Sequence, residues 1–253
     1  MFKDELGEAV EITAKLHVST NTKSYFCRAR AVPHALRTKI EQELQCLQDQ
    51  KVIEPVQMSE WMAPLVPVLK PDGSIRLCGD YKLTINRVAK PDVYPLPRME
   101  ELFATLAGGK HFTKLDLAHA YQQIPLEESS KQYVTINTHK GLYRYNRLPF
   151  GVAAAPSIFQ RTMESLLQGI PHVSIYLDDI LVTGTSEADH LDTLDQVLTR
   201  LEDAGLRLKQ SKCAFLLLSV DYLGHRISEK GLQPTEEKSG PVKRHPLQPM
   251  FFS

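Results

Sequence analysis

The chain has 253 residues, with 30 basic and 30 acidic side chains and a formal net charge of zero at pH 7. This length allows one large or two small domains with a sizeable core. The zero net charge argues mildly against a nucleic-acid-binding protein, which commonly has a basic surface, but a basic groove beside an acidic site would cancel in the sum. No run is long and apolar enough to cross a membrane, so no membrane partner is expected.

The N-terminal sequence and the cysteines favour an intracellular protein. The first eight residues are too acidic and polar for a signal peptide. The four cysteines are scattered, and no pair has the spacing of a zinc or redox motif. We therefore expect reduced thiols and a cytoplasmic location, with the nucleus as the alternative.

In chain order, residues 1–30 are expected to be extended or irregular, and apolar residues at helical spacing predict a first helix at about 34–50. Two apolar runs, 63–69 and 75–78, are separated by a turn sequence and predict a β-hairpin. Pro97 suits the first position of a second helix, which Gly108-Gly109 would end.

The second half alternates strands and helices. A third helix opened by Pro156 and a fourth at about 187–204 flank a β-hairpin, and the fourth would bury Leu191, Leu194, Leu198 and Leu201. Further β segments are predicted at 112–116, 133–136, 142–145, 206–208 and 220–223, and 238–253 as a disordered tail. This order indicates an α+β fold, with helices packed on one face of one sheet.

Two adjacent acids mark the predicted hairpin. Tyr176-Leu177-Asp178-Asp179 lies between short apolar runs, and Asp116 ends another apolar run. Clustered carboxylates suit a divalent metal ion, and two such ions can stabilise the attacking and leaving oxygens of a phosphoryl transfer. From the tetrapeptide alone, plain turn residues are an equally good interpretation. The apolar flanks favour the metal site, since buried acids need a compensating cation.

Asp178 and Asp179 are expected to differ in role, because successive strand residues point to opposite faces. Asp116 and Asp178 can meet only if their strands are neighbours in the sheet.

The chain resembles the reverse transcriptases of long-terminal-repeat retrotransposons of the Ty3/gypsy type and, more distantly, those of retroviruses. The resemblance covers roughly residues 25–238 and rests on several motifs in order. These are Ser59-Glu60-Trp61-Met62-Ala63-Pro64, Lys70-Pro71-Asp72-Gly73-Ser74-Ile75-Arg76, Phe112-Thr113-Lys114-Leu115-Asp116 running on to Ala120-Tyr121-Gln122-Gln123, Leu148-Pro149-Phe150-Gly151 with Ala155-Pro156, the acidic hairpin, and Tyr222-Leu223-Gly224-His225.

The resemblance implies a right-hand polymerase fold made of fingers and palm. The family pattern stops after Lys238, so the thumb is expected to be absent. The implied divisions are an N-terminal extension (1–24), fingers (25–91 and 124–161), palm (92–123 and 162–237) and the tail (238–253).

The resemblance also implies an RNA-directed DNA polymerase that uses two Mg²⁺ ions, with Mn²⁺ as the alternative. Its implied partners are deoxynucleoside triphosphates and an RNA or DNA template with a primer. A second copy of the chain, or other parts of a Pol polyprotein, are further candidates. The implied catalytic acids and metal ligands are Asp116, Asp178 and Asp179; the nucleotide-binding residues are Arg76, Lys70, Tyr121 as steric gate, Phe150 and Gly151; and Leu223 and Gly224 resemble the primer grip.

Plainer roles stay open for some of these residues. Arg76 could be an exposed strand charge, Tyr121 a core aromatic and Phe150 a loop-packing residue, while the two interpretations of Lys70 are balanced. Two hypotheses for the whole chain follow. One is an active polymerase, favoured by the intact acids. The other is an inactive retroelement remnant that only binds nucleic acid or protein, favoured by the absent thumb.

Overall fold

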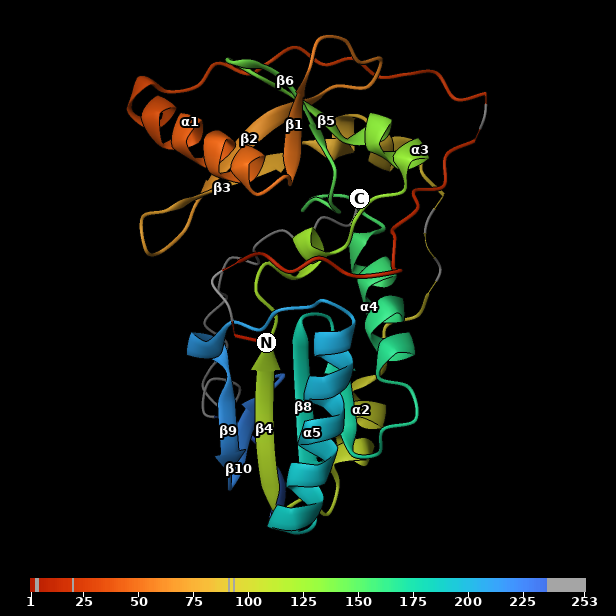
Figure 1. Cartoon of the computed structure of the whole chain (residues 1–253), viewed down its shortest axis with the longest axis vertical. Coiled ribbons are helices and arrows are strands. Elements are labelled where there is room, and N and C mark those ends of the chain that lie inside the picture. Colours follow the sequence, from red (N-terminus) through yellow and green to blue (C-terminus); the bar gives the residue numbers. More distant parts are fainter. Residues whose placement is uncertain (3–4, 20, 91, 93, 236–253) are drawn as a thin grey trace.

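The computed structural model describes residues 1–2, 5–19, 21–90, 92 and 94–235. The described chain forms three sheets and five α-helices, which confirms the predicted α+β class. The molecule is elongated, with a five-stranded sheet at one end and a four-stranded sheet at the other (Figure 1). The predicted tail at 238–253 lies outside the described residues.

Two separate chain segments build the five-stranded sheet, whose order is β1-β6-β5-β2-β3. One hairpin joins β2 to β3 and another joins β5 to β6, and a short parallel pairing of β2 with β5 connects them. Helix α1 packs against β3 and β1, and Ile40, Leu44 and Leu47 are its buried residues. The elements are α1 (His34–Asp49), β1 (Ile53–Val56), β2 (Ala63–Leu69), β3 (Ile75–Gly79), β5 (Thr135–Thr138) and β6 (Gly141–Tyr145), with the short α3 (Glu128–Lys131) nearby.

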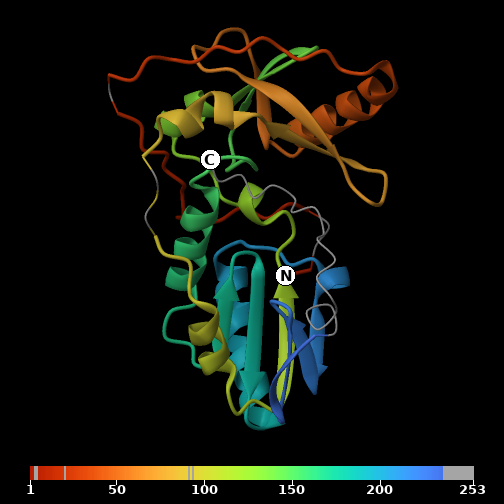
Figure 2. The ribbon, with the colours of Figure 1, turned by 180° about the vertical axis from the view of Figure 1, so that it is seen from behind.

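The four-stranded sheet has the order β7-β8-β4-β9. Helix α5 lies over β8 and β4, whereas α2 and α4 contact the edge strand β7 (Figure 2). The C-terminal end of β4 points toward the five-stranded sheet, so it lies near the middle of the molecule. The elements are α2 (Met99–Leu106), β4 (His111–Asp116), α4 (Ala155–Leu166), β7 (Val173–Tyr176), β8 (Asp179–Gly184), α5 (Glu187–Asp203) and β9 (Ala214–Leu217).

A three-stranded antiparallel sheet of β10 (Ser219–Tyr222), β11 (His225–Ser228) and β12 (Gly231–Pro234) packs beside the four-stranded sheet. Val220, Tyr222 and Ile227 form a small core with Phe112 of β4 and Leu102 of α2. The three-stranded sheet therefore packs against β4 of the four-stranded sheet.

The N-terminal segment is extended, as predicted, and connects both ends of the molecule. Its backbone N–H groups donate from Val10 to Ala204 O (3.0 Å) and from Ala14 to Pro125 O (2.7 Å). Further along, Cys27 N–H donates to Met62 O at the edge of β2 (2.9 Å).

The two helix starts lie close to their predicted positions. Helix α2, predicted to begin near Pro97, begins at Met99, where Glu101 Oε2 accepts a hydrogen bond from Arg98 N–H (3.1 Å). Helix α4 begins at Ala155 and has Pro156 in its first turn, as predicted. The single sheet predicted from the order of elements in the second half of the chain was wrong, because β5 and β6 belong to the five-stranded sheet and β4, β7 and β8 to the four-stranded one.

Two β predictions and one helix face also need correction. A 3-10 turn over 132–134 takes up the start of the segment expected at 133–136. The expected strand at 206–208 is replaced by one isolated bridge between Leu208 and Leu117. In α5 the side chain of Leu191 is 43% exposed, because the buried face starts one residue earlier, at His190.

No helix among the described residues has both the length and the apolar character needed to cross a membrane.

Candidate active site

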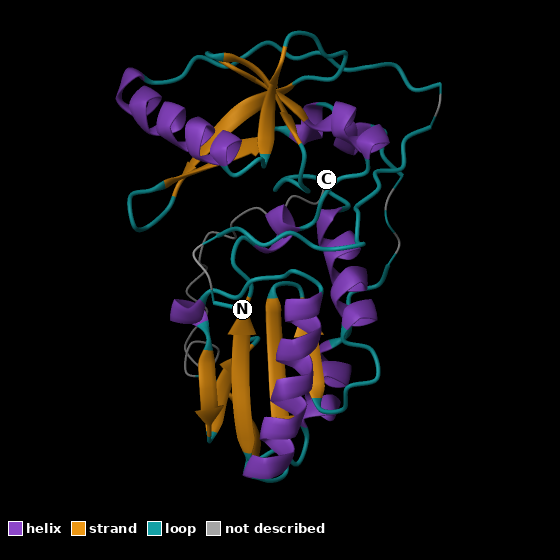
Figure 3. Ribbon diagram, viewed as in Figure 1, coloured by secondary structure: helices purple, strands orange, loops and turns teal. Residues whose placement is uncertain are grey.

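The strand pairing brings the predicted acids to one end of the four-stranded sheet. Asp116 is the last residue of β4, and antiparallel pairing with β8 places it directly opposite Asp179. These strands are the long central pair of the lower sheet in Figure 3. The condition that the Asp116 strand and the hairpin be neighbours is therefore met.

The hairpin tip separates the two adjacent acids. Tyr176 pairs with Asp179, so Asp179 belongs to β8, and Leu177 and Asp178 form the two-residue turn. Leu177 has a φ of 55°, a left-handed conformation that is sterically disfavoured for leucine. Asp178 is exposed at the tip, while Asp179 is half-buried in the strand.

Asp116 is the most buried of the three acids, with a side chain that is 12% exposed. Burial raises its pKa, and the nearby charges of Asp178 and Asp179 raise it further, whereas the ammonium group of Lys212 lowers it. Lys212 Nζ lies 3.0 Å from Oδ2 and 3.2 Å from Oδ1 of Asp116. The three carboxylates are thus close enough to repel one another, and a lysine compensates the most buried one.

A second lysine compensates the negative charge of Asp179. Lys114 Nζ lies 2.9 Å from Asp179 Oδ2, and both side chains are 28% exposed. Lys114 is two residues before Asp116 in β4, so the two side chains leave the strand on the same face.

The carboxylates fit the chemistry of a magnesium site but do not form a complete one. Within the part of the chain that the structure describes, no three His, Cys, Asp or Glu side chains are grouped closely enough to hold a metal ion by themselves. Magnesium is usually bound by one or two carboxylates together with water and substrate phosphates. Asp116 and Asp179 each have one lysine partner, while Asp178 is exposed beside them, so the three carboxylates offer oxygen ligands of the kind that a divalent cation prefers.

Three of the predicted nucleotide-binding side chains lie in contact. The Arg76 guanidinium is 4.4 Å from the centre of the Phe150 ring, a cation–π distance. The Tyr121 ring is 5.2 Å from that of Phe150 and 5.3 Å from that of Phe159. Burial and the charge of Asp178 raise the pKa of Tyr121 to about 12. This aromatic group therefore adjoins the acidic hairpin.

Gly151 occupies a position where a side chain would not fit. Its φ is +94°, and a Cβ would lie 3.0 Å from the Gly79 carbonyl oxygen at the end of β3. Its own carbonyl accepts a hydrogen bond from Asn86 Nδ2 (2.8 Å). The glycine allows the loop of Phe150 to pack closely on β3, the strand that carries Arg76.

Several cations lie near His119, three residues after Asp116. Partial desolvation lowers the pKa of His119, and the positive charges of Lys70, Lys209, Arg76 and Lys212 lower it further. Lys70 comes from the turn between β2 and β3, where its N–H donates to Ser74 O (2.9 Å). Lysine and arginine side chains from separate segments therefore converge near His119.

Leu223 and Gly224 form the turn between β10 and β11, with φ values of 50° and 76°. Leu223 packs against the small core that includes Phe112 of β4. The turn thus belongs to the three-stranded sheet.

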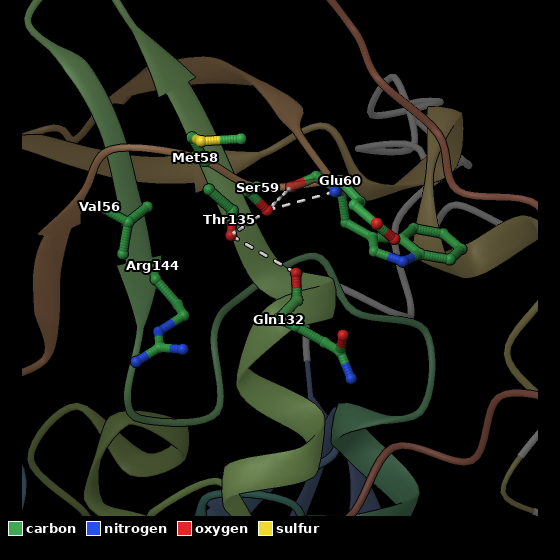
Figure 4. A pocket seen from close by; sticks show the side chains of 8 residues that line it. Val56, Met58, Ser59, Glu60, Gln132, Thr135 and Arg144 are labelled. Atoms are coloured by element: carbon green, nitrogen blue, oxygen red, sulfur yellow. Dashed lines mark hydrogen bonds between the residues drawn. The ribbon is translucent and has the colours of Figure 1, made fainter.

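One cavity adjoins these residues and another lies beside the five-stranded sheet. The first, of about 520 Å³, lies next to the end of β4 and is lined by Ala118, His119 and Lys209 and by Leu6 of the N-terminal segment. The other, of about 320 Å³, lies between β1, β6 and the turn before β5 (Figure 4). In the second cavity the polar groups serve the fold: Ser59 Oγ donates to the Trp61 carbonyl (2.7 Å) and contacts Thr135 Oγ1 (3.0 Å).

Sequence reasoning missed three residues that shape this site. Lys212 and Lys114 reach the acids, and the strand alternation of Lys114 with Asp116 was an available signal. The fully buried Gln160 hydrogen-bonds to the hairpin, and a glutamine between the apolar residues Phe159 and Met163 was its only signal.

Comparison with known proteins gives concordant results. A family model described as "Reverse transcriptase (RNA-dependent DNA polymerase)" matches residues 68–227. The retrovirus-related Pol polyprotein from transposon 297 of Drosophila melanogaster is 31% identical over 250 residues, covering 95% of this chain and 24% of that protein. The transposon Tf2-3 polyprotein of Schizosaccharomyces pombe is 37% identical over 176 residues, covering 69% of this chain and 13% of that protein. The chain spans about a quarter or less of these relatives.

Solved structures show the same fold. A foamy viral protease-reverse transcriptase in complex with double-stranded DNA superposes with a TM-score of 0.82 at 26% identity, covering 92% of this chain and 41% of that chain. A native prototype foamy virus protease-reverse transcriptase gives a TM-score of 0.76 at 26% identity, covering 87% of this chain and 29% of that chain.

Proposed function

Because the chain belongs to the reverse transcriptase (RNA-dependent DNA polymerase) family, we propose that it contains the fingers and palm of an RNA-directed DNA polymerase. Its reaction is the addition of deoxynucleotides to a primer 3′ end on an RNA or DNA template. The observation that carries this proposal is the pairing of Asp116 with Asp179, beside the exposed Asp178 at the hairpin tip. Residues 25–91 and 124–161 are the fingers, and 92–123 and 162–237 are the palm.

In this proposal the three carboxylates hold the metal. Mg²⁺ bound there would stabilise the charge that develops on the attacking and leaving oxygens of the phosphoryl transfer. Asp116 and Asp178 would be the main ligands. Asp179 would be secondary, because it lies within β8, paired with Tyr176, whereas Asp178 is exposed at the hairpin tip. Lys212 Nζ contacts both carboxylate oxygens of Asp116 and would compete with such an ion.

The remaining residues bind and orient the nucleotide. Arg76 and Lys70 provide positive charge for the triphosphate, and Phe150 fixes the Arg76 guanidinium by stacking. Tyr121 occupies the space that a ribose 2′-hydroxyl would need, and its packing on Phe150 and Phe159 holds the ring in place. Catalysis then comes mainly from positioning and charge neutralisation. Leu223 and Gly224 are proposed to support the primer end.

One observation favours the alternative of a binding module that does not polymerise. Lysines compensate both Asp116 and Asp179, so the carboxylates are stable without metal.

A primer-extension assay separates the two functions. We expect the wild-type chain to extend oligo(dT) on poly(rA) with magnesium, and Asp178→Asn to lose at least about a hundredfold in rate because it removes a ligand charge. Circular dichroism would establish that both proteins are folded. A folded wild type that extends no primer would exclude the polymerase function for this chain.

A further inference from the structure

We propose that Gln160 of α4 is a positioning residue that holds the tip of the β7–β8 hairpin and thereby fixes the carboxylate of Asp178. Its importance for the reaction rests on the proposed polymerase function. Its importance for the hairpin conformation does not.

The Gln160 amide binds the hairpin at two backbone positions, near the end of β7 and at the first residue of the turn. Its Oε1 accepts a hydrogen bond from the Leu177 N–H (2.7 Å), and its Nε2 donates to the Ile175 carbonyl (2.9 Å). A second bond from Nε2 goes to Glu164 Oε1 (2.7 Å), one turn further along α4. Because an N–H needs an acceptor and a carbonyl needs a donor, only one orientation of the amide satisfies both backbone groups.

Burial makes these bonds effective. The Gln160 side chain is 0% exposed, so water cannot replace either partner. An unpaired amide or an unpaired Leu177 N–H at this position would lose a hydrogen bond without compensation. The buried hydrogen bonds of Gln160 therefore connect α4 firmly to the hairpin tip.

The backbone conformation of Leu177 explains why the turn needs these hydrogen bonds. Its left-handed backbone (φ 55°) is disfavoured for a residue with a Cβ, and glycine would adopt it freely. A disfavoured backbone conformation persists only where surrounding contacts stabilise it. Here the contact is the hydrogen bond between Gln160 and the backbone N–H of Leu177. Asp178 is the next residue, so the conformation of Leu177 helps to set where the Asp178 side chain leaves the backbone.

Gln160→Met tests whether the two hydrogen bonds hold the hairpin tip, since it keeps the length of the side chain and removes both bonds. In the metal-free protein we expect the Leu177 amide hydrogen to exchange with solvent at least about tenfold faster, because it loses its acceptor. In primer extension we expect kcat to fall about tenfold or more while KM for the deoxynucleotide stays within about twofold, since the acid is misplaced but the nucleotide site is intact.

Two further variants sharpen the test. Glu164→Ala removes the third bond of Gln160, together with the bond that Tyr94 OH donates to Glu164, and leaves both hairpin bonds in place, so Leu177 exchange and kcat are expected to match the wild type. Leu177→Gly in the Gln160→Met background is expected to recover most of the lost kcat, because glycine takes the left-handed turn without support. If Gln160→Met does not fold, Gln160→Asn withdraws the amide by one methylene and gives the same readouts.

Unchanged Leu177 exchange in a folded Gln160 variant would overturn the proposal. So would a loss of kcat in Glu164→Ala equal to that in Gln160→Met, which would indicate general destabilisation. A folded wild type that extends no primer contradicts the polymerase function instead, and the exchange result then decides whether Gln160 holds the hairpin.

Discussion

Lys212 and Asp116 form an ion pair across 96 positions of the chain, with Nζ 3.0 Å from Oδ2 and 3.2 Å from Oδ1. The lysine side chain is 54% exposed and the aspartate side chain only 12%. The ammonium group thus lies on the carboxylate that is proposed to bind metal, and it competes with a divalent ion for the same oxygens.

Lys212→Met is therefore expected to bind Mn²⁺ about fivefold more tightly in the metal-free protein, which corresponds to ~1 kcal/mol for a half-exposed ion pair. Titration of free Mn²⁺ by electron paramagnetic resonance measures this. Lys110→Met is a matched control, because Lys110 pairs with Glu229 (2.9 Å) at the opposite end of β4. Equal affinities in the two variants would show that Lys212 does not compete for the site.

Tyr121 packs on Phe150 and Phe159 beside the acidic hairpin. We expect Tyr121→Ala to increase incorporation of ribonucleotides relative to deoxynucleotides by on the order of tenfold to a hundredfold, because the space for a 2′-hydroxyl opens. Single-nucleotide kcat/KM ratios measure the discrimination. Tyr121→Phe keeps the ring and should discriminate like the wild type. If it loses discrimination as Tyr121→Ala does, the ring is not the gate.

Phe150 holds the guanidinium of Arg76 at 4.4 Å from its ring centre. Phe150→Leu keeps an apolar side chain but removes the cation–π contact of about 0.5–1 kcal/mol, so KM for the deoxynucleotide is expected to rise about two- to fivefold. Phe150→Tyr retains an aromatic face and is the matched control. Steady-state primer extension gives both constants, and an unchanged KM in Phe150→Leu would contradict the positioning of Arg76 by stacking.

His190 is fully buried in α5, and its Nε2 lies 2.7 Å from Thr113 Oγ1 of β4. Burial lowers the pKa of His190 below its ordinary value of 6.5. The unfolded chain therefore binds a proton at pH values where the folded chain does not, so the stability is complete above about pH 6.5 and declines as the pH falls below it.

We expect the free energy of unfolding, measured by urea titration, to decrease between pH 6.5 and 5. His190→Gln keeps a hydrogen-bonding group but does not titrate, so its decrease over this range should be smaller. Part of the slope should persist, because the pKa of His119 is lowered as well. An equal slope in both proteins would mean that His190 does not carry the pH dependence.

Local patterns predicted much of the fold correctly. The periodicity of α1, the turn sequence between β2 and β3 and the apolar flanks of the β7–β8 hairpin all gave elements close to those observed. Such features depend on neighbouring residues only. The start of α2 lies two residues after Pro97, where a side-chain hydrogen bond of Glu101 stands at the helix start. The error at Leu191 arose because packing on β8 and β4 set the buried face of α5.

For the site, the sequence by itself determined which side chains are available: the acids Asp116, Asp178 and Asp179, and the motifs that resemble a polymerase. Only the tertiary structure decided how they meet, because strand register and long-range packing are not encoded in local spacing. It placed Asp116 opposite Asp179 rather than Asp178, brought Lys212 onto Asp116, and set the buried amide of Gln160 under the hairpin tip.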